Sequence, residues 1–501
     1  MNSKTVSALV VAGAILGIWG DILFQGSAGW GINALGWTLA VAAAIALLRR
    51  RAGLVENPTG KGLAISAIVI AAGAGWRDST MLHALDVLTT AVLLALWAAD
   101  GVAGALSRSY LWGYILSCAA SIGHTFVGCG LFLGSDVDWA SVRSRPGGSS
   151  AKPVLRGLIL SVPLLLVFGN LFANADPVYA HFVQELFSWD ITDCVVRLFW
   201  ILAIAWGSIG FVRYALNGLA SDGGDFPVRG GFLGKIEAVT ILGSLDLLFL
   251  SFVAVQFRYL FGGAALVHAT IGLTYAEYAR AGFFELSTAS GLLLPVLLLL
   301  NWMVDKSDGA AVKSFRRLGA IQIGLLFVVM ASAMQRMHIY QMAFGLTEMR
   351  VYTVAFMGWL ALVFLWLGVS VLRGSADRFT FGAVSAAVAV LAVLHLVDPD
   401  SLIVSNNARL ALRTGHFDGC YAQTLSADAV PALVDTLPHV DPPTQAIIAR
   451  AILAWTPPVN IDWRDWNVGK GLAWNAAEQN TPGLRDMLKN LPSNACEDES
   501  D

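Results

Sequence analysis

Residues 379–400 have the sequence FTFGAVSAAVAVLAVLHLVDPD, and this stretch decides the fold. Its first part, 379–397, contains no Asp, Glu, Lys or Arg. A helix of that length is about 28 Å long, which matches the roughly 30 Å hydrocarbon core of a bilayer. We therefore predict a membrane helix over 379–397, followed by a separate unit over 398–501.

The composition of the whole chain fits this prediction. Of 501 residues, 56% are hydrophobic and 13% are charged, and the mean hydropathy is +0.65. A soluble protein has about 25% charged residues, so this chain has too few to cover a water-facing surface of its size. The net charge of −3 also excludes a basic nucleic-acid-binding protein, and five cysteines cannot form a disulfide scaffold.

Eleven segments approach the 17 to 25 apolar residues that a membrane helix needs. The predicted fold is therefore an all-α, polytopic helical membrane protein with a transmembrane domain over 1–397. The predicted spans are 5–24, 31–48, 62–76, 80–98, 157–174, 194–212, 236–257, 281–302, 318–338, 351–372 and 379–397.

One further apolar segment, 110–134, is interrupted by Gly, Ser and His residues. If it crossed the membrane, the cationic loops 213–235 and 303–317 would face outward, against the positive-inside rule. We therefore expect 110–134 to be a re-entrant or in-plane element. The N-terminus is then cytoplasmic and the C-terminus extracytoplasmic.

Residues 398–501 carry 14 acidic and 7 basic residues, a net charge of −7, and we predict a small helical cap domain on the outer face. Two Asp/Thr-Pro steps, at Pro442 and Pro482, are typical of helix starts, and Gly415 is typical of a helix end. Cys420 and Cys496 are the only cysteines of this unit. An oxidising exterior would allow them to pair, but two free thiols are an equal alternative.

Several charged residues fall inside or beside the predicted spans, where each costs at least about 2.5 to 3.5 kcal/mol unless it has a partner or a polar cavity. Two explanations stay open: a structural network of ion pairs, or an outward-facing cavity that holds an anion such as a phosphate or a lipid head group. The candidate binding residues are Asp246, Arg258, Glu277, Arg280, Glu285, Arg336 and Arg350.

Asp246 is the best candidate for ion coupling, because it is the one carboxylate expected near the middle of a span. The alternative is a neutral carboxyl group that bonds to a neighbouring helix. Gly13 and Gly17 form a Gly-x-x-x-Gly face that predicts close packing of another helix. The chain has no C-x-x-C, H-E-x-x-H or P-loop motif, so we expect no metal and no cofactor.

Several short motifs occur in an order that resembles a family of bacterial polytopic membrane proteins of unknown function, the 4173 type with its 4153-type relatives. The resemblance covers roughly residues 15–430 and implies a multi-pass protein of the bacterial inner membrane, with no known substrate. The motifs are Gly20-Asp21-Ile22-Leu23-Phe24, Trp76-Arg77-Asp78-Ser79, Pro163 with Phe168-Gly169, Ala175-Asp176-Pro177, Tyr278-Ala279-Arg280-Ala281-Gly282-Phe283-Phe284-Glu285, Gly345-Leu346-Thr347 with Arg350, and Asp398-Pro399-Asp400.

Three classes of function fit these observations. A transporter of a solute, ion or lipid would use Asp246, Glu285 and the outer arginines, and is slightly favoured. An envelope sensor or scaffold would bind a partner protein through the cap domain, and its buried charges would be structural. A transferase acting on lipid-linked substrates would need residues such as Asp176, Glu285 and Arg336, but no long catalytic loop is present.

Overall fold

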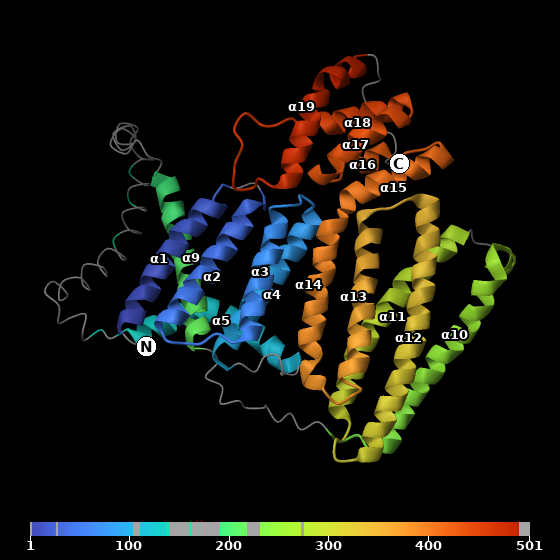
Figure 1. The fold of residues 1–501 in the computed structure, drawn as a ribbon, viewed down its shortest axis with the longest axis horizontal. Coiled ribbons are helices and arrows are strands. Elements are labelled where there is room, and N and C mark those ends of the chain that lie inside the picture. The colour runs from blue at the N-terminus through green and yellow to red at the C-terminus, as the bar shows by residue number, and fades with distance from the viewer. Residues whose placement is uncertain are drawn as a thin grey trace.

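The computed structural model describes residues 3–26, 29–103, 111–137, 191–217, 231–271 and 275–489, together with positions 139, 161, 168 and 172. This part of the chain is helical throughout, apart from an isolated bridge between Leu233 and Val304. The prediction of an all-helical fold is confirmed. Figure 1 shows a wide layer of roughly parallel helices with a smaller helical domain on one side, opposite the N-terminus.

The first bundle of helices has its own hydrophobic core. It contains α1 (Ser3–Phe24), α2 (Ile32–Arg51), α3 (Pro58–Ala74), α4 (Thr80–Ala103), α5 (Leu111–Leu131, followed by a π-helical turn Phe132–Asp136) and α9 (Ile191–Asn217). Gly13 and Gly17 of α1 lie directly against α9, where an added Cβ would come within 2.3 Å of Ile209 and 2.6 Å of the Ile201 carbonyl oxygen. The predicted close helix contact at this Gly-x-x-x-Gly face is confirmed.

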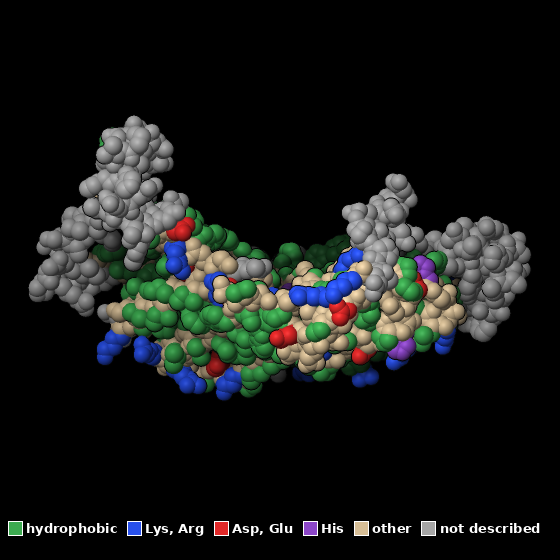
Figure 2. Space-filling model, turned by 90° about the horizontal axis from the view of Figure 1, so that it is seen from above, with side chains coloured by type: hydrophobic (Ala, Val, Ile, Leu, Met, Phe, Trp, Pro, Cys, Tyr) green, Lys and Arg blue, Asp and Glu red, His purple; other side chains and the backbone are tan. Residues whose placement is uncertain are grey.

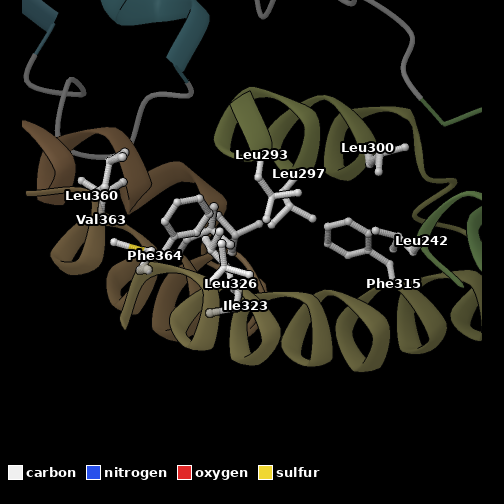
Figure 3. Packing of buried hydrophobic residues seen from close by; sticks show 14 of the residues in the cluster. Leu242, Leu293, Leu297, Leu300, Phe315, Ile323, Leu326, Leu360, Val363 and Phe364 are labelled. Atoms are coloured by element: carbon white, nitrogen blue, oxygen red, sulfur yellow. The ribbon is translucent and has the colours of Figure 1, made fainter. Parts of the chain in front are cut away.

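The second bundle contains α10 (Lys235–Ile271), α11 (Tyr275–Met303), α12 (Gly309–Phe344) and α13 (Glu348–Ser370). Its core is a separate cluster of Leu, Ile, Val and Phe side chains (Figure 3). The next helix, α14 (Phe379–Val397, after a 3-10 turn Ala376–Arg378), lies between the two bundles and contributes side chains to both cores (Figure 1).

The C-terminal domain has a third core of its own. It is built from α15 (Pro399–Thr414), α16 (Gly419–Ala422), α17 (Val430–Thr436), α18 (Pro442–Ala454) and α19 (Val468–Leu488), with 3-10 turns at Ala427–Ala429 (η4) and Leu437–His439 (η5). Two helix boundaries are as predicted: α15 ends at Gly415, whose φ is +74°, and α18 starts with Pro442 after Asp441.

The predicted helix start at Thr481-Pro482 is wrong. Pro482 lies inside α19, which begins much earlier, after Asn467. The Asn467 side chain accepts a hydrogen bond from the Lys470 amide and so supplies the N-cap. Thr481 donates instead to the Ala477 carbonyl oxygen, one turn before it in the same helix.

Ten helices of the described chain are long and apolar enough to cross a membrane, by length and composition. Nine of them match predicted spans. The tenth is Leu111–Asp136, which was expected not to cross, while the predicted span at 62–76 corresponds to the 17-residue α3, and the predicted span at 157–174 lies outside the described residues.

The position of α5 relative to its neighbours bears on whether it crosses. Arg49 of α2 donates to Trp97 and Ala98 carbonyl oxygens in α4 and to the Ala215 carbonyl oxygen in α9, so these three helix ends lie at one level. At the same level, α5 makes contacts from several of its turns. The contacts are Ser121 Oγ to Ala95 O at 3.1 Å, the His124 ring stacked on Tyr214, and Asp136 paired with Arg213. The in-plane interpretation stays a prediction.

Candidate functional site: the junction of the C-terminal domain with the membrane helices

A polar junction lies where the C-terminal domain meets the outer ends of the membrane helices. We define it by Arg77, Asp78, Asp398, Asp400 and Asp428. Arg77 and Asp78 come from the turn between α3 and α4, Asp398 and Asp400 from the start of α15, and Asp428 from the η4 turn. Four carboxylates therefore gather around one guanidinium group.

Asp398 turns the chain from the membrane helix α14 into α15. Its φ of +56° is the only positive φ of a non-glycine residue in the described chain, a conformation that aspartate tolerates better than most residues. Its side chain also caps α15 by accepting a hydrogen bond from Ser401, and Pro399 occupies the first helical position. The direction of the domain relative to α14 is thus set by this residue.

Arg77 is nearly buried and holds three segments together. Its Nη1 atom lies 2.5 Å from Asp398 Oδ2 and 3.9 Å from Asp428 Oδ1, and its Nε donates to the His395 carbonyl oxygen at 2.9 Å. The guanidinium also lies over the Trp76 ring, 4.9 Å from its centroid. Removing this one cation would leave several buried carboxylates without a counter-charge.

Asp78 and Asp428 exchange hydrogen bonds across the junction. The Asp78 amide donates to Asp428 Oδ2 at 2.7 Å, while Asp78 Oδ2 accepts from the Ala427 amide and Asp78 Oδ1 from Asn467 Nδ2 at 2.8 Å. Lys470 Nζ lies 3.7 Å from Asp78 Oδ1. The turn between α3 and α4 is therefore bonded to both η4 and the start of α19.

Burial changes the acidity of the carboxyl groups outside the membrane spans. Desolvation raises the pKa of Asp428, which is 5% exposed, to about 7. It also raises the pKa of Asp398 and of Asp400, against the lowering effect of Arg77 on Asp398 and of the Ser426 hydrogen bonds on Asp400. One oxygen of Asp400 and one of Asp428 accept no hydrogen bond. The junction is therefore a group of carboxyls of which at least one titrates near neutral pH.

A second titratable pair lies directly below the junction, inside the helix layer. His395 Nε2 of α14 is 3.1 Å from Asp86 Oδ2 of α4, and both side chains are buried. The ring fits because α3 has Gly73 opposite it, where an added Cβ would come within 2.2 Å of His395 Nε2. This pair joins α14 to the first bundle.

The C-terminal domain contacts the outer ends of both bundles. On the first bundle, Arg464 donates to the Ile22 and Gln25 carbonyl oxygens, and the amides of Val468 and Gly469 donate to Gly75 and Trp76 carbonyl oxygens.

On the second bundle, Asn407 bonds both backbone groups of Leu346, accepting at 2.6 Å and donating at 2.9 Å. The Glu348 amide donates to the Tyr421 hydroxyl. On the face seen in Figure 2, acidic and basic side chains are interspersed, so the domain presents no field of one sign there.

The predicted binding residues do not form one described cluster. Asp246 is 8% exposed in α10, and neither of its carboxyl oxygens has a hydrogen-bond partner. Glu285 is exposed on α11, and Arg336 is half-buried on α12. Arg350 donates to the Phe344 and Gly345 carbonyl oxygens and lies over the Tyr340 ring, so it closes the end of α12. The side chains of Arg258, Glu277 and Arg280 lie outside the described residues, as does Asp176.

The predicted disulfide is described at one end only. Cys420 is disulfide-bonded, whereas Cys118, Cys129 and Cys194 are free thiols. Cys496 lies outside the described residues, so the pairing of Cys420 with Cys496 stays a prediction.

The sequence analysis contained part of the junction without assigning it a role. The motifs Trp76-Arg77-Asp78-Ser79 and Asp398-Pro399-Asp400 carried the family resemblance, and the structure brings them together. Asp428 was missed, because an isolated aspartate in an acidic domain gives no local signal. Its contact with Asp78 spans 350 residues of sequence.

Comparison with protein families agrees with this architecture. The family described as Domain of unknown function (DUF4153) matches residues 64–436, which include both bundles, α14 and the junction. The chain belongs to this family. The match identifies the DUF4153 type, expected as a relative, and does not extend to the 4173 type. No curated protein and no solved structure matches the chain, so membership of DUF4153 brings no activity with it.

Proposed function

We propose that this integral membrane protein is an envelope sensor or scaffold, in which the C-terminal domain holds the two helix bundles in a fixed relation. The observation that carries the proposal is the double anchoring of the domain. Arg464, Val468 and Gly469 bind the first bundle, while Asn407 and Tyr421 bind the second. A partner that binds or releases the domain would therefore change both bundles together.

The use of the outer arginines supports a structural network over an anion cavity. Arg77 pairs with Asp398, Arg197 lies 3.3 Å from Asp21, and Arg350 binds backbone carbonyl oxygens. A guanidinium group that is already held in this way has fewer donors left for a phosphate or a carboxylate ligand.

For the location, the proposal is the bacterial inner membrane, with the N-terminus in the cytoplasm and the C-terminal domain outside. The cationic loops support this orientation. The level of the α5 contacts supports an in-plane α5. Since α4 ends beside Arg49 and α9 begins beside Asp21, near the other end of α1, a single crossing by 157–174 would then account for the path between them.

The test is a distance measurement between the two bundles in the full-length protein in bilayer nanodiscs. Spin labels are placed at Trp30→Cys, at the outer end of the first bundle, and at Met349→Cys, at the outer end of the second, with the exposed Cys194 replaced by serine. We expect one narrow distance distribution that broadens when Arg77→Gln is added. Arg409→Gln, an exposed arginine of the same domain, is the matched control and should leave it narrow. An unchanged distribution in Arg77→Gln would contradict the proposal.

Ion-coupled transport is the second candidate, because one observation favours it specifically. Asp246 is a buried carboxyl group without a hydrogen-bond partner, inside a helix of the second bundle. Polar groups in such places are expensive and commonly mark an ion or proton path. A solute, a lipid head group or another anion would be the transported species under this candidate.

A further inference from the structure

The helices α10 and α12 run in the same direction and pack along a continuous seam. The seam on α10 is formed by residues at intervals of three and four, among them Leu242, Asp246 and Gln256, and the matching stripe on α12 includes Gln322 and Ser332. Ser332 Oγ donates to Gln256 Oε1 at 2.8 Å, across 76 residues of sequence. This bond fixes the register of the two helices.

The same register brings a second polar pair to one layer. Asp246 and Gln322 are also 76 residues apart, and they lie ten residues, or about 15 Å, from the Gln256–Ser332 layer. Gln322 is fully buried, and both its amide nitrogen and its amide oxygen lack a partner, like both oxygens of Asp246. The two unsatisfied side chains therefore face one another's helix at the same depth.

The surroundings of this layer are apolar. Leu242 lies one turn before Asp246, and Figure 3 shows it with Phe315, Ile323 and Leu326 in the core of the second bundle. No described ion pair involves Asp246. An ionised carboxylate at this place would thus have neither a cation nor a hydrogen bond to stabilise it.

The titratable side chains on the three packed helices point elsewhere in the described chain. On α10 the nearest are Lys235 and Glu237, and on α11 it is Glu285, all of them exposed. On α12, Arg316 and Arg317 are exposed and lie more than a turn nearer the α12 start, while Arg336 lies about 21 Å beyond Gln322 along the helix.

We propose that Asp246 is an intramembrane proton-binding site, whose protonated carboxyl group donates a hydrogen bond to the side-chain oxygen of Gln322. Binding one proton converts the carboxylate into a neutral acid with one donor, and the proton comes from the aqueous phase. The site stands independently of the role of the C-terminal domain, since it uses none of the junction residues.

The test is infrared spectroscopy of the full-length protein in bilayers. At neutral pH we expect a carboxylic-acid carbonyl band whose intensity falls by one carboxyl equivalent in Asp246→Asn. In Gln322→Leu the band should remain and move to higher frequency, because its hydrogen bond is lost. Gln256→Leu, which breaks the satisfied pair on the same seam, is the matched control and should leave the band in place.

Two results would overturn the inference. An undiminished acid band in Asp246→Asn would show that Asp246 is not protonated, and an unmoved band in Gln322→Leu would exclude Gln322 as the partner. Replacing potassium by sodium at constant ionic strength should change nothing, and loss of the band in sodium would contradict a proton as the ligand. Should Asp246→Asn fail to fold, Asp246→Glu retains the acid and should displace the band.

Discussion

Replacing Asp428 by asparagine should remove most of the pH dependence with which the C-terminal domain docks on the membrane helices. In the docked state the pKa of Asp428 is about 7, against 3.8 for an ordinary aspartate. A carboxyl group whose pKa is raised on docking contributes its stability below pH 3.8, and this contribution is lost as the pH rises through 7.

The size of the effect follows from these two values. Between pH 5 and pH 8, linkage gives a loss of about 2.5 kcal/mol, which corresponds to roughly a 70-fold change in the docking equilibrium. Asparagine keeps an oxygen for the Asp78 amide, now 2.7 Å from Asp428 Oδ2, but it cannot ionise. The variant should therefore dock equally well at both pH values.

Hydrogen exchange reports this equilibrium directly. The amides of Asp78, Val468 and Gly469 each donate across the junction, so their protection measures docking. After correction for the intrinsic exchange rate, wild-type protection should fall by about 70-fold from pH 5 to pH 8, and in Asp428→Asn by less than about threefold. Asp435→Asn, at an exposed aspartate of the same domain, is the control and should behave as wild type. An equal fall in Asp428→Asn would refute the reasoning.

Two stability predictions follow from the same region, both measured by thermal unfolding in detergent. Arg77→Gln leaves buried carboxylates uncompensated and should cost about 3 to 5 kcal/mol, and adding Asp398→Asn should recover a large part of this, whereas strictly additive losses would contradict the assigned pair. Gly73→Ala should cost about 1 to 3 kcal/mol, because its Cβ would displace the His395 ring, while Gly62→Ala in the same helix, where the space is open, should be neutral or slightly stabilising. Equal effects of the two alanines would show that His395 does not pack as described.

The membrane helices could be predicted from the sequence, because apolar length alone specifies them. The hydrophobic run 379–397 coincides with α14 to the residue, and the change to polar sequence at Asp398 marks the domain boundary. The same criterion fails where a helix is short or broken. The 17-residue α3 falls below the usual length, and 111–136 meets the length although its contacts lie at one level.

The junction could not be predicted, because its contacts are tertiary. Neither hydropathy nor helix periodicity relates Arg77 to Asp398, which are 321 residues apart, or Asp78 to Asp428. The expectation of partners for the outer arginines pointed in the right direction, but their partners are mostly different. Asp86, for example, pairs with His395 instead of an arginine.

Asp246 shows the opposite case. Its depth in the span and its polarity are legible in the sequence, so it was singled out correctly as a buried carboxyl group. Its relation to Gln322 depends on the register between α10 and α12, which only the packed structure supplies.

The central claim is that the C-terminal domain joins the two bundles as one rigid body, and one exchange experiment tests it across the molecule. Arg464→Ala breaks the anchor on the first bundle, and the amide of Leu346, held by Asn407, reports on the second. If the domain is a rigid bridge, exchange at Leu346 should accelerate together with exchange at Ile32 and Asn33. Faster exchange at Ile32 and Asn33 with full protection at Leu346 would show that the two contacts are independent and would contradict the account.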